Sequence, residues 1–321
     1  MRAYLIRRLL QIIPVFFGIM IITFIIIELS PGDPSGNFIN PRMRPEDRLA
    51  ITAQFGLDGP VYERFFRWVG SMLQGDFGRS FQTRQPVTLM FREMLPPTIL
   101  LGSLSLLVAL LIGVPAGIYS ATKQYSIGDN LLTFLTLIGI SMPAFFFALI
   151  LIRIFSVELG WFPMFGIQDP LFDPPNFVSA AVHRLWHMVL PVTVLGLAQT
   201  ASFMRYTRSS MLEVIKSDYI RTARAKGVRE KVVIYRHAFR NAMIPVVTLL
   251  GFSIPGLISG AIMTETIFSL PGVGRLVVQA VGWRDYPIIL ANVTIFAIVT
   301  LLSMLLADIL YAAVDPRVKY E

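Results

Sequence analysis

The side chains that could carry out chemistry are few and scattered in this sequence. It has no cysteine, which excludes disulfides, thiolate metal sites and cysteine nucleophiles. His183, His187 and His237 have no metal-ligand spacing and are interpreted as structural or interfacial residues. Residues 76–78 read Asp-Phe-Gly, but no Gly-rich loop, strand lysine or catalytic loop accompanies this kinase-like triplet. No P-loop occurs either, so the sequence predicts no catalytic residue, no metal site and no ATP site of its own.

The chemistry-bearing residues that do cluster are basic, and ten of them lie between Arg205 and Arg240. A short helix is expected from about Tyr219 to Lys226, because Ser and Asp before it are favourable N-cap residues. Gly227 suits a left-handed cap at its end. The cations on this helix can pair with acidic groups, and its alanines leave room for a partner's backbone. The pattern favours a docking element over a solvated basic loop.

The residues assigned to this docking element are Asp218, Tyr219, Ile220, Arg221, Thr222, Ala223, Arg224, Ala225, Lys226 and Gly227.

Long apolar runs must position this element. Of all residues, 55% are apolar and only 15% are charged, whereas a soluble domain carries about 25% charged residues. A net charge of +8 would also be compatible with nucleic-acid binding. The basic residues lie beside apolar runs, however, so membrane topology explains their distribution better, and no nucleic-acid partner is expected. We therefore predict an all-α membrane protein with six transmembrane helices. The spans expected are 9–29, 98–119, 131–152, 188–204, 242–263 and 288–313.

Small residues and prolines within the spans predict their packing. Gly113-x-x-x-Gly117 and Gly256-x-x-x-Gly260 are expected to allow close helix contact, mainly within this chain. Pro115, Pro143 and Pro255 are expected to kink the spans that contain them.

The distribution of Lys and Arg predicts that both termini are cytoplasmic. The N-terminus, the 120–130 turn, the 205–241 loop and the C-terminal tail hold sixteen basic residues, whereas the opposite short loops hold four. Short cytoplasmic loops carry such an excess of positive charge. The long 30–97 segment holds eight basic and seven acidic residues, and long loops cross the membrane largely regardless of charge. We expect it to be external.

At this point a family resemblance is apparent. The run Asp218-Tyr-Ile-Arg-Thr-Ala-Arg-Ala-Lys-Gly227, followed by Arg240-Asn-Ala-Met-Ile-Pro245, resembles the signature loop of bacterial ABC importer permeases. More narrowly, it is similar to the dipeptide, oligopeptide and nickel branch. Matching pieces span the chain, among them Pro31-Gly-Asp-Pro34, Gln74-Gly-Asp-Phe-Gly78, Phe155-Ser-Val-Glu-Leu-Gly-Trp161, Pro271-Gly-Val-Gly-Arg275 and Asp308-Ile-Leu-Tyr-Ala-Ala-Val-Asp-Pro316.

The chain departs from the general permease signature in one respect. Arg221-Thr222-Ala223 stands where that signature has Glu-Ala-Ala, and Pro245 lies about five residues later than its spacing predicts. The peptide branch of the family shares this departure. The departure therefore supports assignment of the chain to that branch. Because Arg221 stands in place of the glutamate, the coupling role of that glutamate is not assigned to any residue of this chain.

The resemblance implies a transmembrane permease subunit of an ATP-driven importer in the bacterial cytoplasmic (inner) membrane. The partners implied are a second homologous permease subunit, two cytoplasmic ABC ATPase subunits and an external solute-binding protein. ATP and Mg²⁺ would be bound by the ATPase subunits, with no cofactor in this chain. Peptides or similar small solutes are the expected cargo; nickel chelates, glutathione and oligosaccharides are alternatives within the family.

The predicted domain organisation follows from the spans. Residues 1–29 form the cytoplasmic N-terminus and first span, 30–97 an external subdomain, and 98–313 the permease core with the coupling loop 205–241. The cytoplasmic tail is 314–321. In the external subdomain, Pro45 and the acids after it predict a helix that Gly56 ends, and a second amphipathic helix is expected from Pro60.

Two serines near the predicted kinks are candidates for the translocation path. Ser141 and Ser253 lie near predicted kinks, where backbone carbonyls would face a cavity, and are the candidate path residues. An ion-coupled secondary transporter usually has more spans and places acids at mid-membrane, which the interiors of these spans lack. An intramembrane enzyme would need a Ser/His, His-Glu-x-x-His or paired-aspartate arrangement, and the spans contain none.

Overall fold

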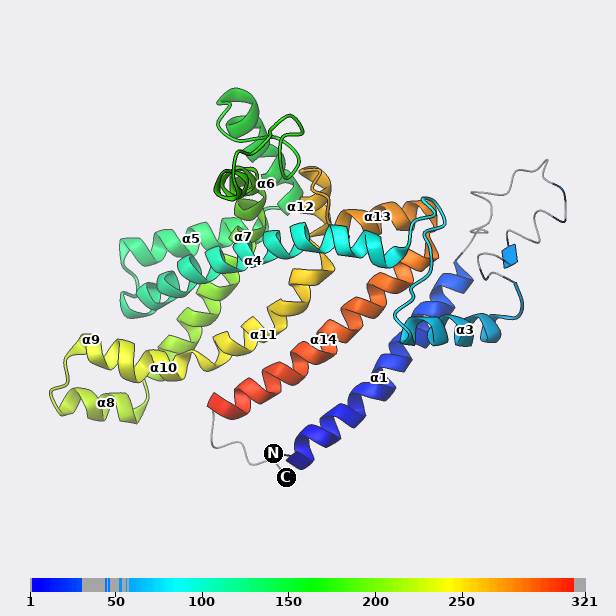
Figure 1. The fold of residues 1–321 in the computed structure, drawn as a ribbon. Helices are drawn as coiled ribbons and strands as arrows, with labels where there is room; N and C mark the ends of the chain where they lie inside the picture. Colours follow the sequence, from blue (N-terminus) through cyan, green and yellow to red (C-terminus); the bar gives the residue numbers. More distant parts are fainter. Residues whose placement is uncertain are drawn as a thin grey trace.

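The computed structural model describes residues 2–30, 44, 46, 52–53, 56 and 58–314. Within these residues the chain is mostly helical, with an isolated bridge between Arg79 and Pro86 and no β-strand. Figure 1 shows long helices crossing the molecule obliquely, with short helices gathered at both of their ends. The helix expected from Pro45 to Gly56 lies largely outside the described residues, and the tail from residue 315 lies wholly outside them.

Five helical stretches of the described chain are long and apolar enough to cross a membrane. They are α1 (Arg2–Leu29), α4 (Val87–Thr122), α7 (Phe177–Ile215), α11 (Ile244–Ser259) with α12 (Ile262–Ile267), and α14 (Tyr286–Val314). Each overlaps one expected span. Helices α4 and α7 extend beyond the expected spans at both ends, so residues 87–97 belong to α4, within the segment assigned to the external subdomain.

The third expected span is broken. Helix α5 (Ile127–Ser141) ends before Met142, and α6 (Ala144–Leu151), continued by the π-helical segment η2 (Ile152–Glu158), leaves at an angle of 105°. Pro143 explains the position of the break, because proline disfavours helical geometry in the residue before it, and Met142 is extended (φ −80°, ψ 124°). A break replaces the expected kink. The described chain therefore has five spans, or six if the bent pair counts as one.

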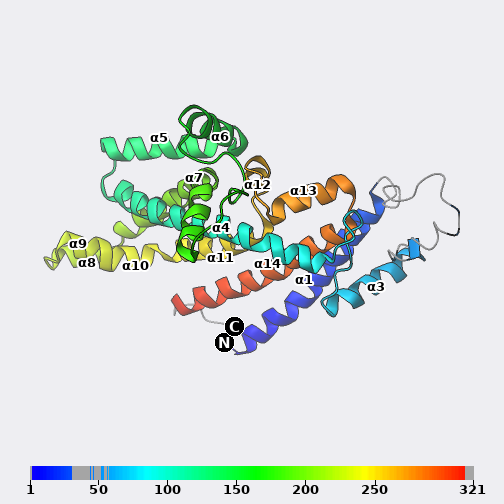
Figure 2. The ribbon, with the colours of Figure 1, turned by 45° about the horizontal axis from the view of Figure 1, so that its top comes forward.

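The connections fall at two opposite ends of the long helices (Figures 1 and 2). One end holds the start of α1, the turn between α4 and α5, the segment from α8 (Asp218–Ala225) to α10 (Phe239–Ala242), and the end of α14. The other end holds α3 (Val61–Leu73), α6, α12 and α13 (Val273–Trp283). The first end therefore carries the connections that are rich in Lys and Arg in the sequence, and the second end carries the short loops that are poor in them.

Helices α4 and α7 make a very close contact. A Cβ atom on Gly113 would lie 2.7 Å from the Thr200 carbonyl oxygen, and one on Gly117 would lie 2.6 Å from the Thr207 Cβ. Only glycine permits this approach, so the first small-residue motif packs within this chain as expected. Of the second motif, Gly260 makes such an approach within this chain, since a Cβ there would lie 2.4 Å from the Gly274 amide nitrogen of α13, whereas Gly256 has no neighbour within 4 Å in the described chain.

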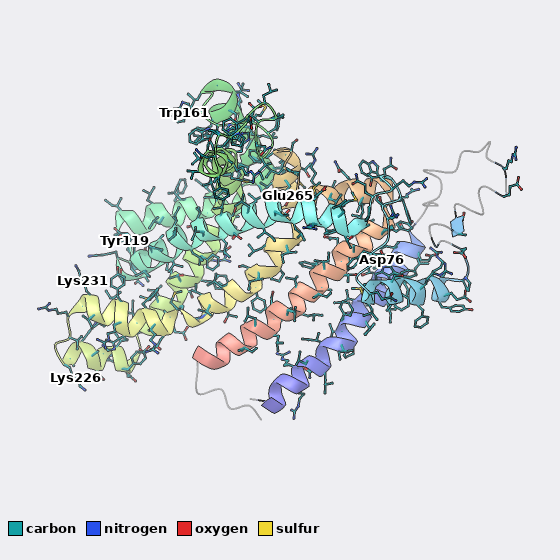
Figure 3. All side chains as sticks on the ribbon, viewed as in Figure 1. Asp76, Tyr119, Trp161, Lys226, Lys231 and Glu265 are labelled. Carbon is teal, nitrogen blue, oxygen red and sulfur yellow. The ribbon has the colours of Figure 1, made fainter. Side chains whose placement is uncertain are left out.

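A buried carboxylate ties together the end of the bundle opposite α8. Glu265 of α12 is fully buried (Figure 3). Its Oε1 accepts hydrogen bonds from Thr98 Oγ1 (2.9 Å) and the Ala261 amide (3.2 Å), and its Oε2 accepts one from the Arg275 amide (3.1 Å). A Cβ on Gly272 would lie 2.4 Å from Glu265 Cδ. A Cβ on Gly274 would lie 2.9 Å from Glu265 Oε2, so both positions beside the carboxylate require glycine.

A second buried carboxylate joins distant segments at the same end. Asp285, immediately before α14, is fully buried. It accepts hydrogen bonds from the Ser80 hydroxyl and from the amides of Phe81 (3.0 Å) and Gln82 (3.2 Å). The loop before α4 is thereby held to the start of α14.

Replacing Glu265 with alanine is expected to destabilise the folded chain by at least about 3 kcal/mol, because three donors lose a buried acceptor and each unsatisfied donor costs about 1–3 kcal/mol. Thermal unfolding of the purified protein in detergent measures the effect. Glu93→Ala, at an exposed position of α4, is the matched control and should leave the midpoint within about 1 °C. Equal stability of the two variants would contradict the anchoring role.

Candidate coupling surface and translocation path

The expected docking helix is present as α8. It spans Asp218–Ala225, one residue earlier at each end than the sequence predicts. Ser217 adopts the extended N-cap conformation, but its hydroxyl donates to the Val214 carbonyl oxygen (2.6 Å) rather than capping the helix. Gly227 has φ +74°, the left-handed conformation that L side chains rarely adopt.

After Gly227 the chain reverses and packs on α8. It returns through α9 (Glu230–Val232), the π-helical segment η3 (Val233–Ala238) and α10, and then enters α11. Helix α8 contacts η3, and Figure 1 shows the two arms side by side at one end of the molecule. We call residues 218–242 the α8 hairpin.

The inner side of α8 is fixed by apolar packing on this chain. Ile220 is fully buried and belongs to one core cluster with Val233, Ala238 and Ala242. Ala223 is partly buried against the same cluster. Burial of an isoleucine side chain contributes about 2–3 kcal/mol, so α8 is held firmly on the returning arm.

The outer side of α8 is exposed. Arg221, Ala225 and Lys226 are all exposed, and Lys226 lies at the tip of the hairpin (Figure 3). Tyr219 is 46% exposed, and its hydroxyl accepts a hydrogen bond from Asn241 Nδ2 (2.9 Å). The two alanines thus differ, because only Ala225 faces outward.

Arg224 forms an ion pair within the hairpin. It donates from Nε to Glu230 Oε2 (3.1 Å) and from Nη2 to Oε1 (2.7 Å). These hydrogen bonds hold the pKa of Glu230 below its usual range and raise the pKa of Arg224. Because the carboxyl pKa is lowered on folding, the stabilisation is complete above the usual glutamate pKa and is lost as the pH falls through the lower folded value. The pair is therefore intact at neutral pH and directs the Arg224 charge toward Glu230.

A buried aspartate beside the hairpin was missed by the sequence analysis. Asp129, at the start of α5, accepts hydrogen bonds from the Ser120 hydroxyl, the Tyr125 amide (2.9 Å) and Arg208 Nη2 (3.1 Å). It therefore joins α4, α5 and α7 near the point where α7 leads into α8. The local signal was the pair Ser126-x-x-Asp129 before an apolar run, since Ser126 Oγ accepts from the Asp129 amide (3.2 Å).

The structure does not bring the two candidate path residues together. Ser253 lines a cavity of about 290 Å³ between α7 and α11, together with Gln199 and Ser202. Ser141 is exposed at the end of α5 and does not line this cavity. The Ser253 hydroxyl donates to the Leu249 carbonyl oxygen (2.8 Å). Gln199 and Ser202 are polar residues of an apolar helix that the sequence analysis did not single out.

Comparison of the full sequence with known proteins identifies related permeases. The oligopeptide transport system permease protein AppB of Bacillus subtilis is 44% identical, and the dipeptide transport system permease protein DppB of Alkalihalophilus pseudofirmus is 41% identical; both alignments cover all of each chain. The glutathione transport system permease protein GsiC of Escherichia coli is 39% identical over 99% of each chain.

The fold resembles that of a solved transporter. The structure of the MetNI methionine ABC transporter in an inward-facing conformation matches with a TM-score of 0.55 and 16% sequence identity. The match covers 71% of this chain and 97% of that chain. At this identity the match supports the fold alone.

Two family descriptions together match nearly the whole chain. The description "Binding-prot-dependent transport system membrane comp, N-term" matches residues 1–102, and "Binding-protein-dependent transport system inner membrane component" matches residues 113–320. The chain therefore belongs to the family of binding-protein-dependent transport system inner membrane components.

Proposed function

We propose that this permease subunit forms part of the path by which peptides enter the bacterial cell through an ATP-driven importer. Identity of 41–44% to oligopeptide and dipeptide permeases over the whole chain supports this cargo and carries the proposal. The glutathione permease relative, at 39% identity, favours glutathione as the second candidate. An external solute-binding protein would deliver the cargo.

The α8 hairpin is the proposed contact with one cytoplasmic ABC ATPase subunit. Its helix is anchored underneath by Ile220 and presents Ala225, Arg221 and Lys226 outward. A small exposed side chain allows a partner to approach the helix backbone, while the cations attract acidic groups. ATP and Mg²⁺ would be bound by the ATPase subunits, and hydrolysis would take place there.

A second, homologous permease subunit would complete the path and carry the second ATPase subunit. Gly256 of α11 has no neighbour within 4 Å of a Cβ position, so this side of α11 is open to a partner helix. The cavity beside Ser253 lies on the same helix. We assign the permease seam and the path to the open side of α11.

The end of the molecule that carries the α8 hairpin would face the cytoplasm. The loops gathered at this end, with the N-terminus and the tail, hold the sixteen basic residues counted from the sequence, against four in the opposite short loops. The segment from α1 to α4, which contains α3, would then be external.

Peptide uptake tests the proposed cargo. The complete importer, reconstituted in vesicles with its binding protein and ATP inside, is expected to accumulate labelled di- or oligopeptides. Excess unlabelled peptide should compete, whereas an oligosaccharide should not. Uptake that responds to glutathione alone would favour the second candidate, and ATP-dependent uptake of neither would contradict the proposal.

Single-cysteine labelling tests the orientation, because the chain has no cysteine. Gln82→Cys and Lys216→Cys place one thiol at each end of the bundle, both at exposed positions. In intact cells an impermeant maleimide should label Cys at 82 and leave Cys at 216 unlabelled until the membrane is permeabilised. The opposite pattern would reverse the orientation.

A bulky side chain at Ala225 tests ATPase docking. Ala225→Trp should weaken association with the ATPase subunits by more than about tenfold, because the exposed indole keeps the partner away from the α8 backbone. Transport and cargo-stimulated ATP hydrolysis should fall with it. Gln124→Trp, in the exposed turn between α4 and α5, is the control. Wild-type ATPase binding in Ala225→Trp would exclude this surface from the contact.

A further inference from the structure

A cavity of about 670 Å³ lies at the end of the molecule opposite the α8 hairpin. It is open on one side and lined by α1, α3, α14 and the loop from residue 76 to residue 86. Asp76, labelled in Figure 3, marks its position where α3 lies against α1. None of the residues assigned to coupling or to the path lines it.

The polar side of this cavity is cationic. Four arginines line it, Arg64 and Arg67 from α3 and Arg79 and Arg84 from the loop, against two carboxylates, Glu28 and Asp76. Glu28 is paired with Arg64 (2.8 Å). Asp76 Oδ1 accepts a hydrogen bond from the Gly78 amide (2.8 Å). Among the described lining residues, arginines therefore outnumber carboxylates by two, and Arg67 is also paired with Asp58, which does not line the cavity.

In the part of the chain that the structure describes, Arg67 and Arg79 each retain guanidinium donors for a ligand. Arg79 Nη1 donates to the Arg84 carbonyl oxygen (3.1 Å), and Arg67 Nη1 pairs with Asp58 (2.7 Å). Each guanidinium has five N–H donors in a planar fork, which suits a phosphate or carboxylate. Arg64 Nε and Trp68 Nε1 are buried and have no hydrogen-bond partner among the described residues, so an anion bound in the cavity would give these donors an acceptor.

The opposite wall of the cavity is apolar and belongs to membrane-spanning helices. Phe24 and Ile27 of α1 and Leu290 of α14 line it. Next to this wall, the outer surface of α1 exposes Ile26 (63%) and Leu29 (78%), which are suited to lipid. The apolar lining therefore continues into a surface that meets acyl chains.

Helix α3 has the character of a helix that lies in the membrane interface. Its inner side packs on α1, where Phe65 and Trp68 contact Phe24 at ring distances of 5.4 and 5.9 Å. Its outer side exposes Tyr62 and Phe66. Aromatic residues beside arginines on an amphipathic helix favour the depth of the lipid head groups.

We propose that this cavity binds the head group of an acidic phospholipid, with its phosphate among Arg67 and Arg79 and its acyl chains along α1. A cargo peptide also carries a carboxylate, but the continuity of the cavity with the exposed apolar surface of α1 favours an amphiphile that is already in the bilayer. Bound lipid would stabilise the packing of α3 on α1. The inference does not depend on the cargo or on the direction of transport.

The test compares two double variants of the assembled transporter. Arg67→Gln with Arg79→Gln removes two charges from the cavity, whereas Arg92→Gln with Arg184→Gln removes two exposed charges near the same end that do not line it. Retention of phosphatidylglycerol relative to phosphatidylcholine in mixed micelles is measured by native mass spectrometry. The cavity variant should lose about 25-fold in selectivity, roughly fivefold for each arginine, and the control should lose none.

Competition experiments identify the occupant. Water-soluble glycerol phosphate should fail to displace phosphatidylglycerol at millimolar concentration, because it lacks the acyl chains. An equal loss of selectivity in both double variants would show a general surface-charge effect and overturn the proposal. Displacement of the lipid by cargo peptide would assign the cavity to cargo and would also overturn it. Unchanged thermal stability of both variants in lipid-free detergent excludes misfolding as the cause.

Discussion

The contact between α4 and α7 is the constraint on which the rest of the structure depends. Gly113 and Gly117 bring the α4 backbone against Thr200 and Thr207 of α7, so the two longest helices cannot slide or separate without losing many contacts. Helix α7 continues with only two intervening residues into α8. The orientation of the α8 hairpin is therefore set within the membrane by glycines about 100 residues earlier in the chain.

Buried carboxylates fix the ends of the bundle where apolar packing alone is non-directional. Asp129 holds α4, α5 and α7 near the hairpin, whereas Glu265 and Asp285 organise the opposite end. Glu265 and Asp285 accept mainly from backbone amides and hydroxyls, so each position of the chain around them is specified by hydrogen-bond geometry. Hydrogen bonds to these carboxylates therefore give the loops at the ends of the membrane helices a defined conformation, which apolar packing alone would not give.

Features with local causes could be predicted from the sequence, whereas those with distant causes could not. The apolar runs marked the spans, and the cap residues and Gly227 marked α8 to within one residue. The opposite placement of Ala223 and Ala225 was also predictable, because residues two apart on a helix do not face the same way. Glu265 and Asp285 were missed because their donors include residues 167 and 205 positions away. The 105° turn at Pro143 was underestimated, since proline locates a break but surrounding helices set its angle.

The α8 hairpin is joined to two membrane-spanning helices, α7 and α11, and these connections determine which helix would move if the hairpin were displaced. The hairpin connects the end of α7 to the beginning of α11, and Ser210 of α7 donates to the Ala242 carbonyl oxygen (2.8 Å), so the two roots of the hairpin are bonded to each other. Helix α11 has 16 residues and is about 24 Å long, and its far end meets the turn held by Glu265. A rod restrained at one end pivots when it is pushed at the other, so each ångström of displacement at the hairpin tilts α11 by roughly 2°. A displacement of the α8 hairpin would therefore rotate α11 about its anchored end, and the hairpin end of α11 would move farther than the anchored end.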